Sequence, residues 1–183
     1  MATRGGAAGF TIIELMIVIG IVGVLAVFAL PSMRDLIVSN RMKTLSMDLY
    51  AGLALARSEA IKRNISSDAG SPRVSMIAAA GGWQNGWKVC IDSNADGDCD
   101  TGEEVILEAD AVDSSITLTG PSGPALVTFN RDGRLPSGST AASFRVVYTA
   151  DNAQVPMRCV ELSVSGRPKT LVDTNATDID GCS

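Results

Sequence analysis

The fold of this chain is decided by residues Gly9–Pro31, which spell GFTIIELMIVIGIVGVLAVFALP. Their apolar run of about 21 residues is long enough to cross a lipid bilayer as a helix. One carboxylate, Glu14, lies near the start of this run. An ionisable group is costly in hydrocarbon, and it usually marks a site whose partner has to be found. We therefore expect this segment to do more than anchor the chain.

The residues in front of the apolar run are unlike an ordinary secretory signal. Residues 1–9 contain one cation, Arg4, and end in the small residues Ala7, Ala8 and Gly9. A secretory signal places such small residues after its apolar stretch, where the cleavage site lies. The reversed order resembles the leader of type IV prepilins and type II secretion pseudopilins.

The resemblance is carried by Gly9, Phe10, Thr11, Glu14 and Pro31. It implies that a prepilin peptidase cuts after Gly9, so that residues 1–9 are a leader and Phe10 becomes the N-methylated first residue. It also implies that Glu14 pairs with the terminal amine of Phe10 in a neighbouring pilin or pseudopilin of a filament, which gives both buried charges a partner. The alternative is that Glu14 reaches the lipid headgroups of a simple anchor.

The helical pattern continues beyond Pro31. Apolar residues recur at helical spacing along one face, at Val38, Met42, Leu45, Leu49, Ala56 and Ala60. We expect Pro31 to kink one long helix rather than end it. Residues 10–31 would be its transmembrane half, and residues 32–64 its amphipathic half, packed on the rest of the chain.

Residues 65–183 are expected to form one β-rich periplasmic domain behind a single-pass inner-membrane anchor. The strand-like runs are Arg73–Ala79, Gly86–Ile91, Glu104–Leu107, Ile116–Thr119, Leu126–Asn130, Ser143–Tyr148 and Arg158–Val164. An antiparallel sheet on the C-terminal half of the helix is the simplest arrangement. The expected fold class is therefore α+β and type IV pilin-like.

Composition excludes several classes of function. The chain has no histidine, so the usual Ser-His, Cys-His and histidine-containing zinc sites cannot form. Its net charge of −5 argues against a generally basic surface for nucleic acid, although a local basic patch is allowed. We expect no enzyme activity.

Later motifs resemble one branch of this family, that of FimT, GspH and FimU. They are the segment Ala56–Asn64, the pair Trp83 and Trp87, and the glycine turns at Phe129–Arg134 and Val164–Lys169. The two tryptophans are best explained as core residues. The resemblance implies a minor pilin that helps to initiate a type IV pilus or to form its tip. The alternatives are a type II secretion pseudopilin and a DNA-binding minor pilin for natural transformation.

Four cysteines in an exported protein suggest disulfides. They are Cys90, Cys99, Cys159 and Cys182, which allow three connectivities. The simplest pairs the near neighbours, Cys90 with Cys99 and Cys159 with Cys182.

An acidic segment between two expected strands matches a calcium-loop pattern. Oxygen-bearing side chains at alternate positions, a glycine at Gly97 and a closing carboxylate suit Ca²⁺. The candidate ligands are Asp92, Asn94, Asp96, Asp98, Asp100 and Glu103. The alternative is a solvated acidic turn, and the strand-like flanks argue against an ordinary EF-hand.

A basic turn is the candidate contact for double-stranded DNA. Arg167 and Lys169 resemble the G-R-x-R motif of DNA-binding FimT-type pilins, with lysine in place of the last arginine. Arg131, Arg134 and Arg158 are candidates to join them on facing strand ends. Such a cluster would hold phosphates without selecting bases. The alternative is a solvated turn.

Overall fold

The computed structural model describes residues 9–65, 71–121, 125–149 and 155–173. The chain divides into two compact units, Met1–Ile37 and Val38–Ser183. The second unit contains the C-terminal part of the long helix together with all of the described strands.

Helix α1 spans Ile12–Arg63 and is continuous through Pro31, so this proline does not end it. Thr11 caps its start, because the Thr11 hydroxyl accepts the Glu14 N–H at 3.3 Å. Just beyond its end, Asn64 has a φ of 49°, the left-handed conformation that commonly terminates helices.

The apolar stripe predicted for the second half of α1 is confirmed. Buried side chains of this part of α1 follow the helical period, at Val38, Met42, Leu49, Leu53, Ala56 and Ala60. Leu45 is partly buried against the same core. One face of the helix is therefore covered by the β-rich part of the second unit.

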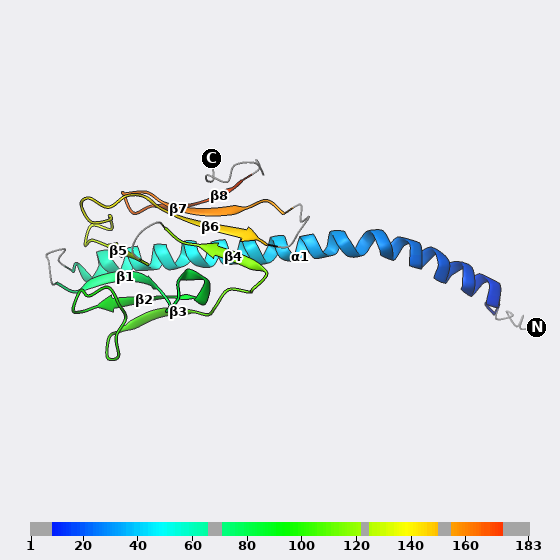
Figure 1. Cartoon of the computed structure of the whole chain (residues 1–183), viewed down its shortest axis with the longest axis horizontal. Coiled ribbons are helices and arrows are strands. Elements are labelled where there is room, and N and C mark those ends of the chain that lie inside the picture. Colours follow the sequence, from blue (N-terminus) through cyan, green and yellow to red (C-terminus); the bar gives the residue numbers. More distant parts are fainter. Residues whose placement is uncertain (1–8, 66–70, 122–124, 150–154, 174–183) are drawn as a thin grey trace, which may run out of the picture. The chain divides into compact units, whose positions relative to one another are not determined.

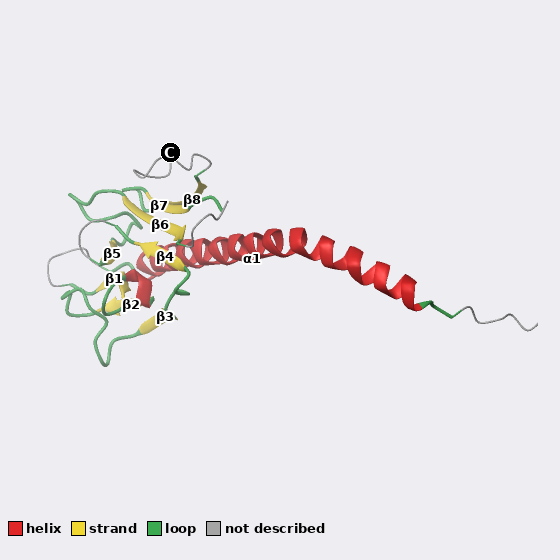
Figure 2. Cartoon of the chain, turned by 45° about the vertical axis from the view of Figure 1, so that its right-hand side comes forward, coloured by secondary structure: helices red, strands yellow, loops and turns green. Residues whose placement is uncertain are grey.

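In the part of the chain that the structure describes, eight antiparallel strands form two four-stranded sheets. The first has the order β3 (Val105–Ala109), β2 (Trp87–Asp92), β1 (Arg73–Ala78) and β5 (Leu126–Phe129). The second has the order β4 (Ile116–Thr119), β6 (Ala142–Tyr148), β7 (Arg158–Leu162) and β8 (Pro168–Val172). Beside the C-terminal part of α1, drawn in cyan in Figure 1, strands β1 to β3 lie on one side and strands β6 to β8 on the other, and β4 and β5 overlap the helix in this view; Figure 2 gives a second angle.

Two expectations about the sheet are corrected. Seven strands in one sheet were expected, whereas the described residues form eight strands in two sheets. The missed strand, β8, begins at a proline and lies at a sheet edge, where a missing N–H is tolerated. Its residues are mostly exposed, so it lacks the apolar alternation that marks a half-buried strand.

Both tryptophans belong to the core, as the sequence predicts. Trp83 lies in a short 3₁₀ helix, η1 (Trp83–Asn85), and Trp87 begins β2. The Trp83 ring meets Phe144 of β6 edge-on, with ring centroids 4.8 Å apart. Edge-to-face pairs of this kind are favourable beyond the area they bury. This contact ties η1 to the second sheet.

A partly buried amide adds a polar link at the same place. The Gln84 side chain of η1 donates to the carbonyl of Ile116 at 2.9 Å and accepts the N–H of Leu118 at 2.7 Å. These two bonds satisfy backbone groups of β4, the edge strand of the second sheet. Gln84 therefore fixes β4 to the segment between β1 and β2.

Candidate functional site

The start of α1 carries the residues that the sequence assigns to processing and assembly. Gly9 and Phe10 are exposed and precede the helix, and Glu14 lies in its first turn. The leader residues 1–8 lie outside the described residues. Thr11 and Glu14 form the T-x-x-E pattern of a capping box, a signal that the sequence analysis overlooked. Glu14 is thus placed where the helix dipole favours a negative charge.

Between Ile12 and Val27, α1 exposes its apolar side chains on every side. Ile13 is 65% exposed and Val27 68%, and Phe10, just before the helix, is 85% exposed. Such a surface is far larger than the apolar patches that single soluble chains usually leave uncovered. No helix of the described residues meets the length and apolarity required of a membrane span.

The acidic segment forms a closed loop between β2 and β3. Asp92, at the end of β2, accepts the Gly97 N–H at 3.0 Å through Oδ2. Glu103 closes the loop, because its carboxylate accepts the N–H of Ser93 at 2.6 Å and that of Asp100 at 3.1 Å. The first and last acidic positions of the motif therefore come together at the neck of the loop.

Side chains in the middle of the loop also bind its backbone. Asn94 Oδ1 accepts the Asp96 N–H at 3.2 Å, and Asp96 Oδ1 accepts the Asp98 N–H at 3.0 Å. The N–H of Asp98 and the amide of Asn94 lower the pKa of Asp96. The negative charge of Asp96 raises the pKa of Asp100, so repulsion inside the loop is only partly relieved.

A disulfide joins Cys90 of β2 to Cys99 of the loop, with their Cα atoms 6.1 Å apart. Cys90 is fully buried, so the bridge ties the loop to the core. Cys159 is buried in β7, but Cys182 lies outside the described residues. The bridge Cys159–Cys182 therefore stays a prediction.

The structure brings part of the expected basic cluster together. Gly133 and Gly166 lie in adjacent turns, because a Cβ added to Gly166 would collide with the Gly133 carbonyl oxygen. Arg131, Arg134 and Arg167 are exposed on these two turns. Leu135 donates its N–H to the Val164 carbonyl at 3.2 Å, which holds the turns side by side.

Two other members of that cluster are placed differently from the expectation. Lys169 forms an ion pair with Glu161 at 2.8 Å, so its charge is partly neutralised. Arg158 begins β7, whereas the Gly166 turn follows the end of β7 at Leu162. The expectation that Arg158 joins the cluster is therefore wrong, because strand direction separates it from the turn.

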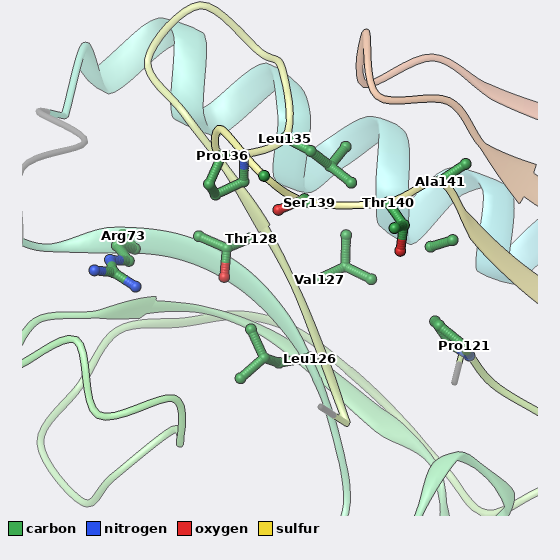
Figure 3. Close-up of a pocket in the computed structure, with 12 residues that line it drawn as sticks. Arg73, Pro121, Leu126, Val127, Thr128, Leu135, Pro136, Ser139, Thr140 and Ala141 are labelled. Atoms are coloured by element: carbon green, nitrogen blue, oxygen red, sulfur yellow. The ribbon is translucent and has the colours of Figure 1, made fainter. Parts of the chain in front are cut away.

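A hollow of about 380 Å³ opens where β5 runs beside residues 135–142 (Figure 3). Leu126, Val127 and Leu135 supply apolar walls, and Arg73 is the titratable group among the described lining residues. That lining lacks a pair of groups suited to acid–base chemistry.

One functional contact was missed by the sequence analysis. Arg63, in the last turn of α1, binds both carboxylate oxygens of Glu104, at 2.9 Å and 2.6 Å. Hydrogen bonding to Arg63 lowers the pKa of Glu104. Since Glu104 follows the closing residue of the acidic loop, this pair links the loop to the helix. Because Arg63 and Glu104 are far apart in the sequence, no local sequence pattern predicts that they form an ion pair.

Comparison with known proteins gives three findings. The family model for type II transport protein GspH matches residues 45–166, and that for the prokaryotic N-terminal methylation motif matches residues 4–30. The type IV major alpha-pilin of Moraxella bovis is 52% identical over 44 residues, which cover 24% of this chain and 28% of that pilin. No solved structure matches. The GspH match spans most of the chain, which therefore belongs to the GspH/FimT family of minor pilins and pseudopilins.

Proposed function

We propose that this chain is a minor subunit of a type IV pilus that helps to initiate assembly of the filament at its tip. The observation that carries the proposal is the apolar N-terminal part of α1, whose side chains are exposed all round in the single chain. Neighbouring helices of a filament would cover this surface, and burial of apolar area is the main driving force for such association.

Processing precedes assembly in this proposal. Prepilin peptidase removes residues 1–9, and Phe10 becomes the methylated terminus of a subunit anchored in the inner membrane by residues 10–31. The domain behind the anchor lies in the periplasm. The match of the methylation motif to residues 4–30 supports this order. The role is structural, without catalysis.

Glu14 serves as the assembly contact. In a filament its carboxylate pairs with the terminal amine of a neighbouring Phe10, so neither charge is left alone in an apolar core. Its position in the capped first turn supports this role, because Glu14 lies at the same end of the helix as Phe10.

The test compares two carboxylates of the same helix in the native host. Glu14→Gln should strongly reduce the amount of this subunit in sheared filaments, whereas Asp48→Asn, at an exposed position of the domain-bound part of α1, should leave it unchanged. Both variants should accumulate in membranes at wild-type levels. Intact-mass analysis should show a chain that begins at methylated Phe10. Normal incorporation of Glu14→Gln, or a chain that retains residues 1–9, would contradict the proposal.

A type II secretion pseudopilin is the second candidate, and the match to the GspH model supports it. The pilin match to the Moraxella protein supports the pilus instead. Deletion of the gene separates the two. Loss of surface pili with normal protein secretion supports the pilus role, and the reverse result supports the secretion role.

DNA contact is a third candidate, supported by the packing of the two basic turns. Arg131, Arg134 and Arg167 would hold phosphates, with Lys169 contributing less because Glu161 pairs with it. Binding would be independent of base sequence and steeply dependent on salt, since counterions are released.

Gel shifts with the full chain in detergent test this contact. The double change Arg134→Gln and Arg167→Gln should weaken binding at low salt and reduce the salt slope by about two. Lys43→Gln, an exposed cation of α1, is the matched control. Absence of a shift for the wild-type chain would remove this candidate.

A further inference from the structure

The acidic loop between β2 and β3 contains an unsatisfied carboxylate oxygen. Asp92 is 1% exposed, and its Oδ1 has no hydrogen-bond partner within the described residues. Its other oxygen, Oδ2, accepts the Gly97 N–H, so the carboxylate is directed into the loop. A charged oxygen that is removed from water without a partner is strongly destabilising. Something outside the described residues is therefore needed to satisfy it.

The chemistry of the loop points to a hard cation. Residues 92–103 carry five carboxylates and no lysine or arginine. Arg73 lies opposite Asp92 in the register of β1 and β2, yet Asp92 Oδ1 has no hydrogen-bond partner within the described residues. Arg63 binds Glu104, just outside the loop. A cation from solution would supply the partner that Asp92 Oδ1 lacks.

We propose that this loop is a calcium site flanked by strands. Asp92 Oδ1 is the first ligand, and Glu103 is the closing ligand at the neck of the loop. The remaining oxygens come from the positions between them, namely the side chains of Asn94, Asp96 and Asp100 and the backbone carbonyl of Asp98. Six to eight oxygen ligands at about 2.3–2.6 Å are what Ca²⁺ requires.

Binding requires a small rearrangement of side chains. In the described conformation the loop carboxylates face backbone N–H groups, and no three His, Cys, Asp or Glu side chains of the described residues converge closely enough to hold an ion. Asp92 Oδ1 can face an ion while Oδ2 keeps its bond to the Gly97 N–H. Both oxygens of Glu103 accept backbone N–H groups, so Glu103 must exchange one of these bonds for the ion. Asp96 must likewise give up the bond that its Oδ2 accepts from Asn94. The ion offsets the repulsion among these groups and satisfies Asp92 Oδ1.

The backbone of the loop is already constrained in a closed form. The Cys90–Cys99 disulfide ties its middle to β2. Gly97 has a φ of 91°, and a Cβ added there would lie 2.9 Å from Leu126 of β5, so the turn packs closely on the first sheet. A loop that is ordered before it binds loses less conformational entropy on binding.

The first experiment measures calcium binding to the full chain in detergent. Calorimetric titration with CaCl₂ should show saturable binding. At calcium one hundred times its Kd, the melting temperature should rise by about 5–10 °C over that in chelator. Magnesium at the same concentration and ionic strength should raise it much less, because Mg²⁺ demands a near-ideal octahedral site. No heat and an unchanged melting temperature, or an equal response to magnesium, would overturn the proposal.

The second experiment assigns the site to Asp92. Asp92→Asn should weaken calcium affinity by at least about tenfold, because even the loss of a group that only supports a ligand typically costs about 10–100-fold. In chelator the same variant should be at least as stable as wild type, because a buried unpaired charge is gone. Asp110→Asn, an exposed carboxylate outside the loop, is the control for net charge and should behave as wild type.

Glu103→Gln keeps the test decisive if Asp92→Asn does not fold. It should weaken calcium affinity to a similar extent, because a bidentate closing carboxylate is lost. A purely structural role of the loop predicts that both variants keep the wild-type response to calcium. That result would overturn the proposal.

Discussion

The two parts of α1 differ in what covers their apolar side chains. In the part from Val38 to Arg63, a single stripe is apolar and buried, with Leu49 and Leu53 fully removed from solvent. In the part from Ile12 to Val27, apolar side chains occupy every face and remain exposed, as at Leu15 and Ile21. The chain's own sheets cover the apolar stripe of the first part. The apolar surface of the second part can be covered only by other molecules.

This comparison separates folding from assembly. Substitutions in the buried stripe should act on the stability of the domain, because they remove packing that the chain itself supplies. Substitutions in the exposed part should act on incorporation into filaments while the domain stays intact.

The largest effect is expected from a matched pair of leucines on the same helix. Leu49→Ala should lower the free energy of unfolding by about 2–5 kcal/mol, because Leu49 is fully buried and the change leaves a cavity. Leu15→Ala, at a position 57% exposed, should change it by less than about 0.5 kcal/mol. Denaturant unfolding of the full chain in detergent measures both. Equal losses of stability would show that the division of α1 is wrong.

Incorporation into sheared filaments provides the complementary measurement. Leu15→Ala should reduce the amount of subunit in filaments although its unfolding is unchanged. Leu49→Ala should reduce that amount only as far as it lowers the level of folded protein in the membrane.

A second matched pair compares a covered turn with an open one. Gly166 and Gly138 both have positive φ, 73° and 86°. A Cβ at Gly166 would collide with the Gly133 carbonyl, whereas no atom lies within 4 Å of a Cβ at Gly138. Gly138→Ala should therefore cost only the strain of a left-handed alanine, about 1 kcal/mol. Gly166→Ala should cost more, by about 1–3 kcal/mol in addition.

Thermal melting of the two glycine variants gives the difference directly. If they are equally destabilised, the turns at Gly133 and Gly166 do not pack closely. The basic surface of Arg131, Arg134 and Arg167 would then lose its structural support, and the proposed DNA contact with it.

Helix α1 and most strands are predictable from the sequence because their signals are local. The period of the apolar residues from Val38 to Ala60 marks the buried face, and glycine-rich turns delimit strands such as Ile116–Thr119. The acidic loop and the Cys90–Cys99 bridge are recognised from short spacings alone.

What the sequence does not reveal is how distant segments meet. The division into two sheets depends on pairings such as β1 with β5 and β4 with β6, which skip over intervening strands. The Gln84 bonds to β4 and the buried Oδ1 of Asp92 arise only after those pairings form. Likewise, the separation of Arg158 from the Gly166 turn follows from strand direction and not from residue type.

The smallest effect is expected at the end of the covered part of α1, where Arg63 binds Glu104. Arg63 keeps the pKa of Glu104 below its ordinary value of 4.5 in the folded protein. A carboxyl group whose pKa is lowered by folding stabilises the fold above its unfolded pKa, and it loses that contribution as the pH falls through the folded value. The contribution of this pair should therefore be complete at neutral pH and be lost progressively in acid, as the pH falls through the lowered pKa of Glu104.

Glu104→Gln measures that contribution. The variant should melt slightly below wild type at neutral pH, and the difference should vanish in strong acid and shrink in high salt, because the pair is largely exposed and solvent screens it. Glu108→Gln is the matched control, since Glu108 forms a single contact with Lys88 at 3.1 Å between adjacent strands. It should have a smaller effect than Glu104→Gln, because a bidentate arginine contact is stronger than a single lysine contact. A difference that persists at low pH would mean that Glu104 stabilises the helix end through packing instead of charge.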